Sequence, residues 1–173
     1  MDKKSAKCDS YPWLRIIPRW LFGIAEIGLS IYLVLLFNAN LGLIFGAFWA
    51  FSLFVMLPFI RCSRCYYYGK RCNTGWGLIA GFAFPKSDPI YFQAGYGLTI
   101  FLWPLRILPI GLGILYLRTG ITFNPDGLFG IYLAVLILHR LYCRIVSCTI
   151  CHQKDVCPVY NPRVLAKKSA VRF

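Results

Sequence analysis

The sequence predicts an all-α membrane protein with four transmembrane helices in two helix-hairpin repeats, and with cysteine-rich loops on the cytoplasmic side. Three observations support this fold class. The 173-residue chain is 58% hydrophobic and 17% aromatic with only six acidic residues, four apolar segments are long enough to cross a bilayer, and motifs recur between its two halves. We expect one integral membrane domain over 1–173, with the first hairpin and its cysteine loop in 1–89 and the second in 90–173.

A hydrocarbon core of about 30 Å requires about 20 apolar residues per helix. Four segments meet this requirement: 19–37, 41–60, 97–117 and 127–147. The first follows three lysines but lacks a small-x-small cleavage site, so we interpret it as a retained helix and not as a secretory signal. Residues 76–87 are apolar but too short to span, which indicates a re-entrant or interfacial segment. Pro104 and Pro109 are expected to kink or break the inner end of the third helix.

The basic residues predict the orientation of the bundle. Of the 19, five precede residue 20, five lie between residues 61 and 89, and seven lie between residues 140 and 172. With four helices these regions share one side, and the positive-inside rule places both termini and the central loop in the cytoplasm. We therefore expect the formal charge of +13 to face anionic membrane lipids, and we expect no nucleic-acid partner.

All eight cysteines fall on that same predicted side. Cytosolic thiols are normally kept reduced, so closely spaced cysteines there favour metal binding or redox chemistry over structural disulfides. The tyrosines at 66–68 are interpreted as interfacial aromatics, with the lining of a metal cluster as the alternative. The candidate metal ligands are Cys8, Cys62, Cys65, Cys72, Cys143, Cys148, Cys151 and Cys157.

The cysteine spacing recurs along the chain. In each half a Phe-Asn pair stands 25 residues before a C-x2-C pair, and a further cysteine follows that pair. An LRIIP sequence at 14–18 is matched by LRILP at 105–109. Two parallel copies related by an axis along the membrane normal would bring both cysteine loops together beneath the bundle.

Several kinds of chemistry fit these cysteines. Eight thiols fill two four-ligand sites, as iron–sulfur clusters of the 4Fe–4S type require, and this is the preferred cofactor. The alternative is one tetrahedral zinc site with four thiolate ligands from the two C-x2-C pairs, which leaves four cysteines unused. The sequence CTICH at 148–152 also matches covalent c-type haem attachment, but such haems are attached outside the cytoplasm. Dithiol exchange is a further alternative, because membrane thiol oxidases share this architecture.

Two polar residues lie within the predicted spans. Glu26 is the only acidic residue in an apolar segment, and a carboxylate there is costly enough to be a functional candidate. His139 lies at a comparable depth, so the two side chains could meet. We expect them to handle protons during reduction of a quinone. The alternative is a hydrogen bond that only joins two helices.

Together these features predict an electron-transfer subunit that relays electrons between a cytosolic redox partner and a quinone or other membrane carrier, within a larger membrane complex. The alternatives are a non-catalytic membrane anchor or scaffold with a structural zinc site, and a membrane thiol–disulfide oxidoreductase. The sequence has no nucleotide-binding loop, HExxH motif, nucleophile elbow or kinase element, so it does not define a class of enzyme.

Overall fold

The computed structural model describes residues 7–92, 102–119, 125–157 and 160. These parts of the chain form helices and contain no β-strand. Three helical segments are long and apolar enough to cross a membrane, namely Trp13–Phe37, Ala39–Arg64 and Gly127–Ser147. For the described residues, the predicted all-helical fold with helices long and apolar enough to span a membrane is therefore confirmed, and a fourth span is not found within these ranges.

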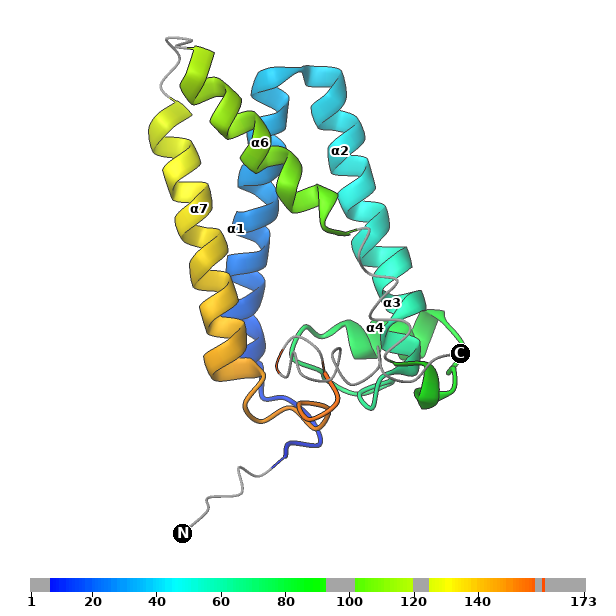
Figure 1. Ribbon diagram of the computed structural model, residues 1–173. Helices are drawn as coiled ribbons and strands as arrows, with labels where there is room; N and C mark the ends of the chain where they lie inside the picture. Colours follow the sequence, from blue (N-terminus) through cyan, green and yellow to red (C-terminus); the bar gives the residue numbers. More distant parts are fainter. Residues whose placement is uncertain (1–6, 93–101, 120–124, 158–159, 161–173) are drawn as a thin grey trace, which may run out of the picture.

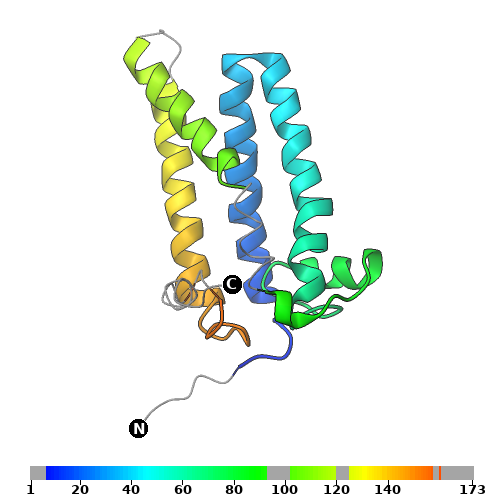
Figure 2. The same cartoon turned by 45° about the vertical axis from the view of Figure 1, so that its right-hand side comes forward.

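Helix α1 (Trp13–Phe37) lies at the centre of the bundle. It packs against α2 (Ala39–Phe51), α6 (Pro104–Thr119) and α7 (Pro125–Tyr142). Figures 1 and 2 show α2 and α7 along opposite sides of α1, with α6 crossing obliquely. The turn between α1 and α2 is fixed by Asn38, whose side chain accepts a hydrogen bond from the Leu41 N–H at 3.0 Å as an N-cap.

Two of the long helical segments contain a π-helical turn a few residues before a C-x2-C pair. Helix α2 continues through Ser52–Met56 into α3 (Leu57–Ile60), and α7 continues through Cys143–Ser147. Pro58 follows the first of these turns and lacks a backbone N–H, so the helical hydrogen-bond pattern must shift there. Both C-x2-C pairs therefore begin where a membrane-spanning helix ends.

The third predicted span, 97–117, differs from the structure. Helix α6 has 16 residues and starts at Pro104, while residues 97–101 lie outside the described ranges. At 1.5 Å per residue this helix covers about 24 Å, less than a hydrocarbon core of about 30 Å. Proline suits the first turn of a helix because no N–H is needed there, so the expected break falls at Pro104. Pro109 lies inside α6.

The cysteines lie at the end of the bundle opposite to the turn between α1 and α2 (Figure 1). This cysteine end also contains α4 (Trp76–Ala83), a 3-10 turn at Cys62–Arg64 and another at Pro89–Tyr91. Helix α4 has eight residues, so the segment predicted at 76–87 is indeed too short to span. Gly77 and Gly81 of α4 face the backbone around Tyr67 and Gly69, and this contact holds the helix against the cysteines.

Candidate metal and redox site at the cysteine end

Three segments that are distant in the sequence meet at the cysteine end. They are the arm (residues 7–12), the first loop (61–75) and the tail loop (147–157). The Cys8 N–H donates to the Ile150 carbonyl at 3.0 Å, and the Tyr11 N–H donates to the Arg71 carbonyl at 2.9 Å. The arm therefore bridges the two cysteine loops by backbone hydrogen bonds.

Two buried tyrosines strengthen this junction. The Tyr67 side chain is 2% exposed; its hydroxyl donates to the Cys8 carbonyl at 2.7 Å and accepts from the His152 N–H at 2.9 Å. The Tyr11 hydroxyl donates to the Ser147 carbonyl at 2.6 Å, and its ring meets that of Tyr67 edge to face. Tyr67 thus ties all three segments together. Its ring packs between the loops, a role that the interpretation of residues 66–68 as interfacial aromatics did not include.

The two cysteine loops share a backbone pattern. Six cysteine carbonyls each accept a hydrogen bond from the N–H three residues further on, at 3.0–3.2 Å: those of Cys62, Cys65, Cys72, Cys148, Cys151 and Cys157. In both loops the backbone N–H two residues after the second cysteine of the C-x2-C pair, that of Tyr67 or Gln153, acts to lower the pKa of that cysteine. Such N–H groups stabilise a thiolate.

The thiols form two neighbouring groups. Cys62, Cys65 and Cys72 interact with one another, and Cys143, Cys148 and Cys157 form the group of the tail loop. Cys151 interacts electrostatically with cysteines of both groups. Its partners are Cys8, Cys65, Cys148 and Cys157. Cys8, Cys62, Cys65, Cys72 and Cys151 also belong to one hydrophobic cluster. The structure therefore brings all eight predicted ligands to one end of the molecule.

The thiols have protein partners in this arrangement. Cys65 donates from sulfur to the Gln153 side-chain oxygen at 3.0 Å, and Cys72 lies 3.1 Å from the Thr74 hydroxyl. In the described parts of the chain, no group of three or more Cys, His, Asp or Glu side chains is arranged to hold a metal ion. Ligation of a shared ion would therefore require these hydrogen bonds to be exchanged for bonds to metal.

Burial keeps the loop thiols protonated. Loss of hydration raises the pKa of Cys65 to about 12 and that of Cys148 to about 11, and it also raises the pKa of Cys151. Neighbouring thiols raise these values further, since two thiolates repel each other. A cation bound among them would reverse this balance, because metal ligation deprotonates a thiol.

A second polar site lies inside the bundle. Glu26 is 2% exposed; its carboxylate accepts from Arg106 Nε at 2.7 Å and contacts His139 Nδ1 at 2.5 Å. The expected contact between Glu26 and His139 is thus present. Arg106 joins them from α6, so one carboxylate on α1 links three helices. Because α1 begins at Trp13 and not at residue 19, Glu26 lies near the middle of its helix instead of near the inner end.

Sequence reasoning missed Arg106, Tyr11 and Gln153 as members of these sites, and it included Tyr67 only in the alternative that residues 66–68 line a metal cluster. Arg106 carried a detectable signal, because an arginine in an apolar segment needs a partner and Glu26 was the available carboxylate. Tyr11 and Gln153 carried none, since their roles follow from contacts between distant segments. Comparison with known protein families, with curated proteins and with solved structures gives no match.

Proposed function

We propose that this chain is an integral membrane electron-transfer subunit whose cysteine end binds iron–sulfur centres. The observation that carries the proposal is the convergence of thiols from the arm, the first loop and the tail loop. Four cysteines hold one cubane cluster, so eight suffice for two. One centre takes Cys8, Cys62, Cys65 and Cys72; the other takes Cys143, Cys148, Cys151 and Cys157.

The shared backbone pattern of the two loops supports two equivalent centres. A duplicated cysteine loop would produce matching turns at six cysteines. It would also produce matching backbone N–H groups near Cys65 and Cys151. The helices upstream also agree, because α1 and α6 each begin one residue before a Leu-Arg pair and each has proline as its sixth residue. We therefore include an internal duplication of hairpin and cysteine loop in the proposal.

The path of electrons follows from the expected orientation. With the cysteine end in the cytoplasm, a cytosolic redox partner reduces or oxidises the centres, and a quinone or other membrane carrier exchanges electrons on the bilayer side. Glu26 and His139 would handle the protons that accompany quinone chemistry. The contacts of Glu26 with His139 and with Arg106 support this role, because they place a carboxylate and an imidazole together within the bundle.

A membrane scaffold with structural zinc is the second candidate. It is favoured by the hydrogen bonds through which Tyr11 and Tyr67 already join the arm to the loops. A tetrahedral zinc site with four cysteine ligands would add a further cross-link between the same segments. Thiol–disulfide exchange is less well supported, because it requires an accessible thiolate and burial raises the pKa of Cys65, Cys148 and Cys151.

Anaerobic purification followed by metal analysis and electron paramagnetic resonance tests the proposal. Iron and acid-labile sulfide in equal amounts, with a paramagnetic signal on reduction, are expected. Cys65→Ser should remove the iron of one centre and Cys148→Ser that of the other. Thr149→Ser, which changes a residue between the two cysteines of the second pair, should retain both. Stoichiometric zinc without iron would establish the scaffold instead, and a metal-free protein that traps mixed disulfides would establish thiol exchange.

A further inference from the structure

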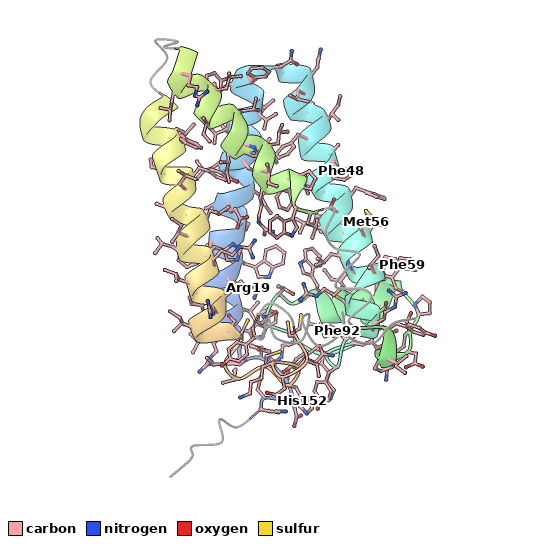
Figure 3. The ribbon with its side chains drawn as sticks, viewed as in Figure 1. Arg19, Phe48, Met56, Phe59, Phe92 and His152 are labelled. Atoms are coloured by element: carbon pink, nitrogen blue, oxygen red, sulfur yellow. The ribbon has the colours of Figure 1, made fainter. Side chains whose placement is uncertain are left out.

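A pocket of about 500 Å³ opens at the cysteine end, within the size range of small-molecule sites. Its walls come from the first loop, the segment before the turn at Pro89–Tyr91, and the tail loop. The polar lining residues are Cys65, Lys70, Lys86, His152 and Gln153, and the apolar ones include Tyr68 and Val156. Figure 3 places His152 at the extreme of this end, away from the membrane-spanning helices.

The pocket is positively charged and contains no carboxylate. Lys70 and Lys86 are exposed, and neither forms an ion pair within the described residues. Three carboxylates lie outside the lining: Asp88 accepts from the Ile90 N–H at 2.9 Å, Asp155 pairs with Lys7 at 2.7 Å, and Asp9 accepts from the Tyr66 hydroxyl at 2.6 Å. Two ammonium groups therefore face a cavity without a counter-charge from the lining.

Gln153 of the lining is placed to donate. Its side-chain oxygen accepts from Cys65, so the remaining polar atom of this amide is its nitrogen, a donor. The Tyr66 ring contacts the Lys70 ammonium, 4.8 Å from its centroid, and the His152 ring, stacked on it at 3.8 Å. These contacts favour one placement of Lys70 and His152 at the pocket before any ligand arrives, which lowers the entropic cost of binding.

We propose that this pocket binds a phosphate monoester carried on a partly apolar molecule. A phosphate monoester has a charge near −2 at neutral pH and three acceptor oxygens, which match two ammonium groups and an amide donor. The Tyr68 and Val156 side chains provide the apolar wall for the rest of the molecule. The phosphate can come from a soluble ester or from a phosphatidic-acid headgroup, because both present the same group. The assignment does not rest on the proposed metal centres.

Lysine acylation of the full chain in phosphatidylcholine nanodiscs, read by mass spectrometry, tests this site. Phenyl phosphate should protect Lys70 and Lys86 at lower concentration than inorganic phosphate, and phenol should protect neither. Replacing either lysine by glutamine should raise the dissociation constant for phenyl phosphate about tenfold, because one charge-assisted hydrogen bond is lost. Nanodiscs that contain phosphatidic acid form the second arm. Protection there without protection by phenyl phosphate assigns the site to lipid.

The control is Arg144→Gln, which removes one positive charge from this end of the molecule but outside the pocket, as each single lysine variant does within it. It should bind phenyl phosphate as the natural chain does. Lys86→Gln changes one exposed side chain, so it keeps the test valid if Lys70→Gln misfolds. Equal loss of binding in the control variant, or no protection in either arm, would overturn the assignment.

Discussion

The Tyr67 hydroxyl is the smallest feature on which the cysteine end depends. It donates to Cys8 and accepts from His152, and its ring is buried. Tyr67→Phe keeps the ring but leaves a buried carbonyl and a buried N–H without partners, which should cost about 1–3 kcal/mol. Thermal unfolding in detergent measures this loss. Tyr66→Phe is the matched control, because the Tyr66 hydroxyl bonds to Asp9 at an exposed position and its loss should change little.

Thiol ionisation gives a second prediction for single residues. In metal-free protein the pKa of Cys65 is about 12 and that of Cys148 about 11, raised by burial. The folded state therefore keeps protons that the unfolded state loses above its ordinary thiol pKa of about 8.5, so stability should fall as pH rises from about 9 to 12. Alkylation of both residues by iodoacetamide should keep accelerating through this range, and in urea it should level off earlier. An early plateau in folded protein contradicts the assignment.

Among the helices, α6 depends on one ion pair. Arg106 of α6 forms an ion pair with Glu26 of α1. Replacing one member of a buried ion pair leaves the other charge without its partner. Glu26→Gln should destabilise the bundle by about 1–3 kcal/mol, less than the about 3–5 kcal/mol for a fully buried pair, because the carboxamide still accepts one bond. A double-mutant cycle with Arg106→Gln measures the coupling. Ser30→Ala, which loses only a bond within α1, is the control.

Helix α4 depends on its glycines. A Cβ at Gly77 would collide with the carbonyl oxygens of Tyr67 and Lys70, which are backbone atoms that cannot rotate away. Gly77→Ala should therefore displace α4 from the first loop and expose Cys65 and Cys72 to maleimide in metal-free protein. Gly111→Ala is the matched helical control, because nothing lies within 4 Å of the added carbon. Unchanged labelling of Gly77→Ala would show that α4 does not cover the loop.

The same elements show what the sequence alone could predict. Continuous apolar runs predicted the helices that contain residues 41–60 and 127–147, because length and hydropathy decide membrane insertion. For the third predicted span, 97–117, the described residues show a helix that begins at Pro104, and 97–101 lie outside the described ranges. At the candidate sites, equal depth predicted the contact of Glu26 with His139. No local pattern predicted Tyr67, since its partners lie 59 and 85 residues away.

At the scale of the whole molecule, all eight cysteines and most of the basic residues that the structure describes share one end, and the orientation of that end decides the chemistry. A reducing compartment keeps thiols available for metal, whereas an oxidising one favours disulfides, thiol exchange or haem attachment. The positive-inside rule predicts that the cysteine end faces the cytoplasm. Two residues distinguish the ends: Lys86 follows α4 in the chain, and Arg118 lies in the last turn of α6. Figure 1 shows α4 at the cysteine end and the last turn of α6 at the opposite end.

Labelling with a membrane-impermeant maleimide in oriented vesicles tests this prediction. Lys86→Cys should react in inside-out vesicles and Arg118→Cys in right-side-out vesicles, because each replaces an exposed side chain at opposite ends of the bundle. The unmodified chain in both preparations gives the background from the native thiols, which burial keeps slow. Reversed labelling would place the cysteines in an oxidising compartment. This result would contradict the proposed iron–sulfur ligation and would favour thiol exchange. Labelling of both variants from the same side would contradict the arrangement of the helices itself.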